Sequence, residues 1–277
     1  MGRKIIRLSP TTHVISLPTE WLRSNHLKKG DELTVTEHPR GLLLENKPFN
    51  RKREVELDLR GMQDDKRFAM VDAAYIAGYD QFRIRIDAEE TQYVHRIINY
   101  FPGFVISEER KGTVTAKDIS DPQAANADQI TLRVHHMIVD MIRDGLEAYT
   151  TKEWKIVQTI KKRDYLINSY VSYAIRQLLR EPKETIEQSL IHVLIKQAEE
   201  FADTAAIILE TSAKKKYKEG VIRQTLAVAE AARQQWQERK NCEALFTISQ
   251  DKNTDTRIRG HAFALYETGL QLWMLQR

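Results

Sequence analysis

Two pairs of oxygen-bearing side chains stand out in the second half of the chain, each with its members four residues apart. In RDYLIN the pair is Asp164 and Asn168, and in EEFAD it is Glu199 and Asp203. Positions four apart share one face of a helix, so each pair would present two oxygen ligands side by side. Carboxylate and amide oxygens suit hard cations such as Mg²⁺, Ca²⁺ or Mn²⁺, and also iron. The four residues are therefore candidate metal ligands.

The helices that carry the two pairs are expected to form an antiparallel hairpin. One helix is predicted over residues 152–180 and another runs to about Ala213, with Pro182 breaking the chain between them because proline has no N–H donor. Asp164 precedes Pro182 by 18 residues, and Glu199 follows it by 17. At a rise of about 1.5 Å per residue, the two pairs come to nearly the same height on adjacent helices.

A purely structural interpretation of these residues stands beside the metal-binding one. Both pairs would then face solvent, or would be neutralised by Lys161, Lys162 and Lys196. A metal-dependent hydrolase is the enzymatic alternative. The sequence shows no Ser/His/Asp or Cys/His constellation and no glycine-rich phosphate loop, so we assign no catalytic residues and expect no enzyme.

Three domains are predicted, at residues 1–50, 52–120 and 121–277. The second interleaves the strand patterns VELDLR, DQFRIRI, FVISEER and GTVTAKD with the helical patterns DDKRFAMVDAAYIAGY and AEETQYVHRIINYF. Its β-α-β-α-β-β order predicts a small α+β connector or dimerisation domain, with two helices on one face of a sheet. The third domain reads as long helices with short connections, which predicts an antiparallel helical bundle.

The first domain is dense in short structural signals. KIIRL and HVISL alternate as strands, Pro18 suits the first turn of a short helix that Gly30 would stop, and ELTVTE and LLL read as two further strands. The resulting ββαββ unit is too small to bury a stable core alone. A second copy of the chain is its simplest partner.

Positive charge is concentrated in the same stretch. Residues 1–53 contain eleven Lys and Arg against five Asp and Glu, a balance of +6, whereas the remaining residues contain 32 against 34. A basic module on a neutral-to-acidic body indicates a head that binds a polyanion. Basic side chains that neutralise phosphates release counterions, and a paired head would present its charge to a two-fold duplex.

The stretch HVISLPTEWLRSNHLKKGDELTVTEHPRGLLLENK resembles the AbrB/SpoVT (MazE-type) swapped-hairpin DNA-binding domain. In that family two copies interleave their hairpins into one small barrel, and residues of the first strands and the loop between them meet DNA. By position, the resemblance implies the DNA-binding candidates Arg3, Lys4, Arg7, Thr11, Thr12 and His13. Arg23 and Lys28 are added on charge alone.

The stretches RDYLINSYVSYAIRQLL and LIKQAEEFADTAAIILE resemble the two motif helices of the PhoU family of phosphate-signalling regulators. Those helices ligate metal through D-x-x-x-D and E-x-x-x-D motifs. The resemblance implies a divalent or iron-type metal at Asp164, Asn168, Glu199 and Asp203, with Asn168 standing where an aspartate is usual. The order of an AbrB-like head, an α+β connector and a PhoU-like bundle resembles the archaeal phosphate-uptake regulators.

The expected function is a homodimeric DNA-binding transcription regulator linked to phosphate uptake or signalling, whose bundle senses a metal or docks a phosphate-signalling protein. The alternative is an adaptor that binds no DNA and regulates a phosphate transporter or signalling partner. No stretch approaches about 18 consecutive apolar residues, so no membrane span is expected. The single cysteine, Cys242, excludes an internal disulfide and favours a cytoplasmic location.

Overall fold

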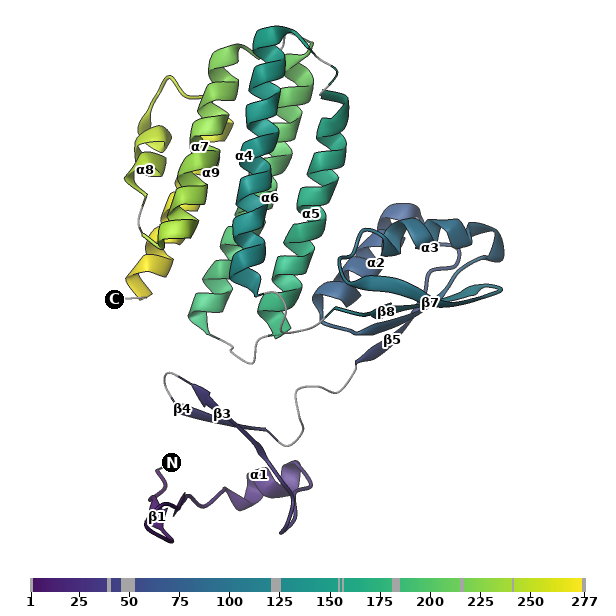
Figure 1. Cartoon of the computed structure of the whole chain (residues 1–277), viewed down its shortest axis with the longest axis vertical. Coiled ribbons are helices and arrows are strands. Elements are labelled where there is room, and N and C mark those ends of the chain that lie inside the picture. Colours follow the sequence, from purple (N-terminus) through teal and green to yellow (C-terminus); the bar gives the residue numbers. More distant parts are fainter. Residues whose placement is uncertain are drawn as a thin grey trace. The chain divides into compact units, whose positions relative to one another are not determined.

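The chain divides into two compact units, Met1–Lys52 and Arg53–Arg277 (Figure 1). The structure, a computed structural model, describes residues 2–38, 41–45, 53–120, 126–153, 155, 157–180, 185–214, 217–240 and 242–275. Within these residues, no helix is both long enough and apolar enough to cross a membrane.

The N-terminal unit consists of two separate strand pairs and a short helix. β1 (Ile6–Arg7) pairs antiparallel with β2 (His13–Val14), and β3 (Thr34–His38) pairs antiparallel with β4 (Gly41–Glu45). Between the two pairs along the chain lies α1 (Thr19–Ser24). The observed order is the predicted ββαββ.

The predicted ends of these elements are wrong in three places. The first two strands are each only two residues long, because Ile6 and Arg7 alone have ladder partners across the hairpin. Pro18 is the N-cap residue of α1 rather than part of its first turn. The helix ends well before Gly30, and His26 adopts the left-handed conformation, with φ of 55°, shortly after it.

Many apolar side chains of this unit are exposed, and others, such as Trp21 and Leu22, are only half-buried. None of its described side chains between residues 2 and 44 is buried. The exposed fractions reach 73% for Ile5, 69% for Leu8, 66% for Leu42 and 55% for Val35. Full burial of such side chains contributes about 1.5–3 kcal/mol each, so a single copy leaves much of its stabilising surface unused.

The first part of the Arg53–Arg277 unit is a mixed sheet covered on one face by two helices, as predicted (Figure 1). The sheet has the order β5-β6-β8-β7, in which β5 and β6 are parallel and the other neighbours antiparallel. Its core includes Leu59, Tyr75, Phe82, Ile84 and Phe101. The elements are β5 (Glu54–Asp58), α2 (Asp64–Ile76), β6 (Gln81–Arg85), the 3-10 turn η1 (Ala88–Glu90), α3 (Thr91–Ile98), β7 (Phe104–Arg110) and β8 (Thr113–Asp118).

The second part of this unit is a helical bundle (Figure 1). α4 packs against α5 and α7, α5 packs against α6, and both α6 and α8 pack against α9. The helices are α4 (Ala127–Thr151), α5 (Val157–Arg180), α6 (Ile186–Ser212), α7 (Glu219–Glu238), α8 (Glu243–Gln250) and α9 (Thr256–Leu275). The helix predicted from residue 152 begins at Val157, because α4 continues to Thr151 and Lys152 ends it with φ of 61°.

Helix α5 fastens the sheet domain to the bundle. Arg176 has a fully buried side chain, which donates hydrogen bonds to the Tyr75 carbonyl and to Asp118 Oδ2, the latter at 2.8 Å. One turn further on, Arg180 pairs with Asp80 and, at 3.1 Å, with Asp118. These ion pairs join one helix of the bundle to the residue before β6 and to the last residue of β8, so the α+β part and the bundle form one body at this seam.

Candidate functional site

The hairpin of α5 and α6 brings the two predicted pairs together. Asp164 on α5 lies near enough to Asp203 on α6 for the negative charge of Asp203 to contribute to raising the pKa of Asp164. One turn along, Asn168 and Glu199 line the same pocket. The pairs therefore meet across the two helices, with the first member of one opposite the second member of the other, as an antiparallel hairpin requires.

The site is acidic, and burial raises the pKa of two of its carboxyl groups. The pKa of Asp164 is raised to about 6, first by burial and then by the negative charge and hydrogen bond of Asp203. Burial also raises the pKa of Glu199, against the opposing influence of Lys196, which forms an ion pair with it. Neutralisation by a lysine, the purely structural interpretation, therefore holds for Glu199, which pairs with Lys196, but not for Asp164.

Two oxygens of this site have no hydrogen-bond partner. Asp164 Oδ1 and Asn168 Oδ1 are both buried and unsatisfied. Buried acceptors without donors are costly, at about 1–3 kcal/mol each, and a cation would satisfy them. Across the part of the chain that the structure describes, no group of three His, Cys, Asp or Glu side chains is arranged to hold a metal ion. The donors fit a hard cation in type, and Asn168 would have to complete the ligand set.

Replacing Asp164 with asparagine is expected to remove a pH-dependent destabilisation. The folded-state pKa of Asp164 is about 6, above the ordinary value of 3.8, so the folded chain holds this proton more tightly than the unfolded chain. The resulting contribution to stability is fully present below about pH 4 and is lost as the pH rises through 6. Because the group is half-buried and partly screened, the loss is about 1 kcal/mol between pH 4 and pH 7. Urea unfolding in the presence of a chelator measures it.

The matched control is Asp140→Asn, since the Asp140 side chain is 65% exposed and pairs with Arg143 on the bundle surface. Its unfolding free energy should keep the pH dependence of the parent chain. Identical pH slopes for the parent and the Asp164 variant would contradict the assignment.

A fourth carboxylate, Asp72, joins the site from the sheet domain. It lies on α2, its Oδ1 accepts a hydrogen bond from Ser172 Oγ of α5 at 2.9 Å, and burial raises its pKa. Sequence reasoning missed this residue. The available signal was a single acid inside the apolar helical run FAMVDAAYI.

The hairpin of β1 and β2 brings four of the DNA-binding candidates together, whereas Arg3 and Lys4 lie in the segment that leads into β1. Arg7 and His13 lie directly opposite each other in the β1–β2 register, and Thr11 and Thr12 belong to the turn that joins these strands. Arg7 Nε donates to the carbonyl oxygen of Ser9 at 3.1 Å, which braces the turn. The six candidates, all exposed, are Arg3, Lys4, Arg7, Thr11, Thr12 and His13.

The two candidates chosen on charge alone lie on other elements. Arg23 is exposed in the last turn of α1. Lys28 is exposed between α1 and β3, where its backbone N–H donates to Asp31 Oδ2 at 2.7 Å. They extend the basic surface of the unit but do not belong to the hairpin.

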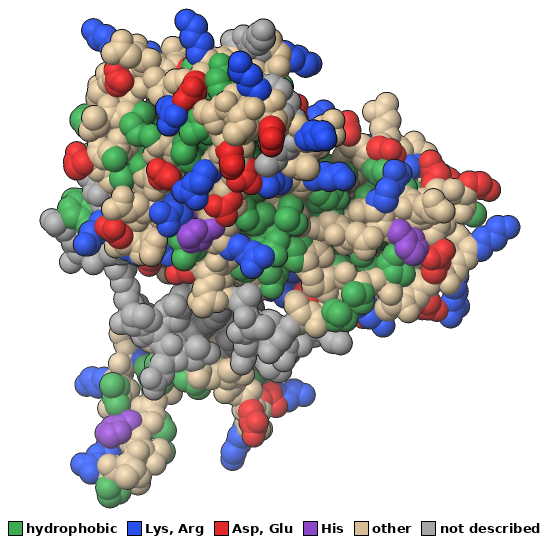
Figure 2. Space-filling view, turned by 45° about the horizontal axis from the view of Figure 1, so that its top comes forward, with side chains coloured by type: hydrophobic (Ala, Val, Ile, Leu, Met, Phe, Trp, Pro, Cys, Tyr) green, Lys and Arg blue, Asp and Glu red, His purple; other side chains and the backbone are tan. Residues whose placement is uncertain are grey.

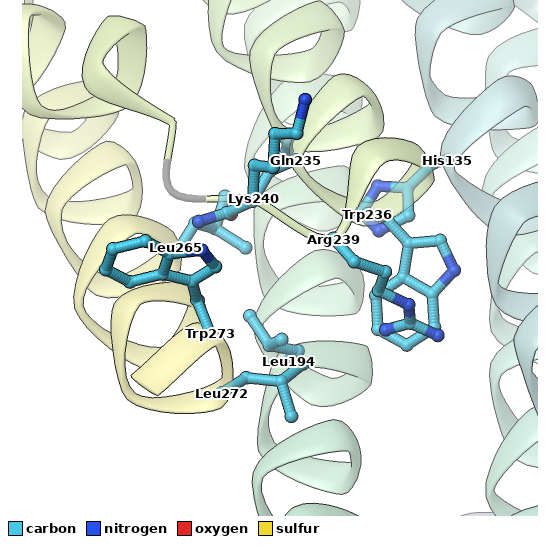
Figure 3. A pocket seen from close by; sticks show the side chains of 11 residues that line it. His135, Leu194, Gln235, Trp236, Arg239, Lys240, Leu265, Leu272 and Trp273 are labelled. Atoms are coloured by element: carbon cyan, nitrogen blue, oxygen red, sulfur yellow. The ribbon is translucent and has the colours of Figure 1, made fainter. Parts of the chain in front are cut away.

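A second cavity lies inside the bundle but is too small for an effector. Its volume is about 20 Å³, enough for one water molecule. Figure 3 shows the Arg239 guanidinium over the Trp236 ring, at 4.0 Å from its centroid, beside the buried His135. Burial lowers the pKa of His135 to about 4, so this histidine is neutral at pH 7. We assign the cavity a packing role.

Comparison with known proteins gives no relative: no family model, no curated protein and no solved structure matches the chain. The function proposed below is therefore argued from the sequence and the geometry of the sites.

Proposed function

We propose that this protein is a homodimeric DNA-binding transcription regulator whose helical bundle senses a signal linked to phosphate uptake. The observation that carries the proposal is the N-terminal unit, which combines a balance of +6 over residues 1–53 with exposed candidate side chains on the β1–β2 hairpin and the segment that leads into it. Its likeness to swapped-hairpin DNA-binding domains supports the same conclusion.

Dimerisation follows from the exposed apolar surface of this unit. A folded module without buried side chains needs a partner to cover Ile5, Leu8 and Val35, and a second copy supplies a complementary surface by symmetry. In the proposed arrangement two copies interleave their strand pairs into one barrel, which doubles the basic charge facing the duplex. Phosphate contacts then provide affinity, and contacts from the turn to base edges provide sequence preference.

The bundle is the proposed sensor. Asp164, Asn168, Glu199 and Asp203 would hold a divalent or iron-type metal, whose charge would offset the burial and the neighbouring Asp203 charge that together raise the pKa of Asp164. Docking of a phosphate-signalling protein on the bundle is the other form of input that the PhoU likeness supports.

Removing two basic side chains, one on the hairpin and one just before it, is expected to weaken binding to every duplex. In Lys4→Ala/Arg7→Ala, a dimer loses up to about four phosphate contacts, each contributing about 0.9 to the slope of log K against log salt. Fluorescence anisotropy of a labelled duplex, titrated at several salt concentrations, measures both the affinity and the slope.

The control is Lys161→Ala/Lys162→Ala, which removes the same charge from exposed positions of α5. The chain without residues 1–53 is a second comparison, because residues 54–277 contain their own hydrophobic cores. Salt-dependent binding that survives the truncation, or is unchanged in the hairpin variant, would refute the DNA-binding head. A head that binds an acidic protein and no duplex would establish the adaptor function instead.

A further inference from the structure

A pocket of about 370 Å³ lies where the sheet domain meets α5 and α6. Its volume falls within the range of small-molecule sites, about 300–1,000 Å³. Figure 2 shows hydrophobic side chains gathered between the bundle and the sheet domain, with basic and acidic side chains around them. The pocket belongs entirely to the Arg53–Arg277 unit and shares Asn168 and Glu199 with the candidate metal site.

Aromatic rings form one wall of this pocket. The Tyr100 ring lies 4.9 Å from that of Phe68 and 4.7 Å from that of Tyr165, both in edge-to-face contact. Tyr100 is almost fully buried, whereas Tyr165 is half-exposed at the rim. Val171 and Ile175 continue the apolar lining. Ring faces attract cations, and the apolar lining favours a ligand with a hydrocarbon part.

The polar lining is rich in hydrogen-bond acceptors. Asp72 and Glu199 contribute two carboxylates, while Lys196 is the only basic side chain among the lining residues and already pairs with Glu199. Asn168 adds a buried Oδ1 atom that has no donor. The pKa of Tyr100 is raised, first by burial and then by Asp72 and Glu199, so both carboxylates lie near the same ring.

We propose that this pocket binds a small organic amine, in which a primary ammonium group is attached to an apolar or aromatic body. An ammonium group has three N–H donors, which match the Asp72 and Glu199 carboxylates and Asn168 Oδ1. The apolar body packs against Phe68, Tyr100 and Tyr165. A metal bound by Asn168 and Glu199 would compete with the amine for these two residues, but a hydrated Mg²⁺ ion retains several waters and gains nothing from the apolar wall.

A ligand in this pocket could act on the chain independently of DNA binding. The lining residues come from α2 and Tyr100 on one side and from α5 and α6 on the other, so a bound amine contacts the sheet domain and the bundle together. Its occupancy would stabilise the seam that Arg176 and Asp118 form between the two.

Isothermal titration of the full chain with phenethylamine, in the presence of a chelator, tests the proposal. 3-Phenylpropionate is the matched probe, since it has the same body and the opposite charge. We expect one saturable site per chain for the amine and none for the carboxylate. Asp72→Asn should weaken amine binding at least tenfold, about 1.4 kcal/mol. Tyr165→Ala removes only a half-exposed ring and should weaken it several-fold.

Asp140→Asn serves again as the control, because it removes an exposed carboxylate of α4 that is not among the lining residues. Its amine affinity should equal that of the parent chain, and melting curves should show that every variant folds. The proposal is overturned if 3-phenylpropionate binds as well as the amine, if a separate titration without chelator shows that Mg²⁺ binds although the amine does not, or if both pocket variants retain full affinity. None of these results depends on whether the N-terminal unit binds DNA.

Discussion

Replacing Arg176 with methionine is expected to lower the free energy of unfolding of the Arg53–Arg277 unit by about 3–5 kcal/mol. The side chain is 0% exposed, and its guanidinium lies 4.7 Å from the centroid of the Tyr75 ring. Methionine fills much of the volume but supplies no donor. The Asp118 side chain, only 4% exposed, would then keep a single cationic partner, Arg180.

The pKa of Asp118 supports the size of this effect. Burial alone would raise that pKa, but hydrogen bonds from Ser120 and Arg176 outweigh it and the pKa is lowered. The carboxylate is therefore charged at neutral pH and depends on its partners. Without Arg176, an incompletely compensated charge remains between the sheet and α5.

Urea unfolding followed by circular dichroism measures the change. Arg143→Met is the matched control, because the Arg143 side chain is 54% exposed and its pairs with Asp140 and Glu230 lie on the surface, where about 0–1 kcal/mol is expected. The double variant Arg176→Met/Asp118→Leu should recover part of the loss, since it removes both buried charges. Equal stability of the two single variants would show that Arg176 does not hold the seam.

The role of Arg176 was not predictable from the sequence, although the helix that carries it was. In SYVSYAIRQLL the apolar stripe predicts α5, and an arginine beside it reads as a surface residue. Its partners Tyr75 and Asp118 lie 101 and 58 residues away. Pairings of this kind depend on how a sheet docks on a bundle, which periodicity does not encode.

The relative positions of the four candidate metal ligands were predictable from the sequence, whereas their other contacts were not. Helical spacing and one proline placed Asp164 opposite the α6 pair, because an antiparallel hairpin fixes the register of its helices. The lysine that pairs with Glu199 was one of three equal possibilities in the sequence. The contribution of Asp72 required the tertiary contact between α2 and α5.

In the N-terminal unit, by contrast, the sequence patterns predict the order of the strands correctly but overestimate the length of the first two. KIIRL and HVISL alternate over five residues each, yet only two residues of each pair within one chain. An alternating pattern indicates that one face of a strand is buried, whether the covering residues belong to the same chain or to a second copy. The exposed apolar positions Ile5, Leu8 and Ile15 are what strands completed by a second copy would present.

Introducing a lysine at Val35 of β3 is therefore expected to abolish dimerisation and DNA binding together. Val35 is 55% exposed in the single chain, so the substitution has little to disturb within one copy. In the proposed dimer it costs the burial of one valine per copy, about 1.5 kcal/mol each, and the dimer constant falls by at least about 100-fold.

The added charge makes this variant decisive. A basic side chain should strengthen phosphate binding if the head acts as a monomer, so lost affinity in Val35→Lys points to lost pairing. Thr34→Lys is the control, because neighbouring positions of a strand face opposite sides and Thr34 is exposed. Light scattering and duplex anisotropy on the full chains give the two readouts. If Val35→Lys remains dimeric, or binds the duplex as tightly as Thr34→Lys, then this strand face is not the interface and the basic hairpin must reach DNA without the two-fold barrel.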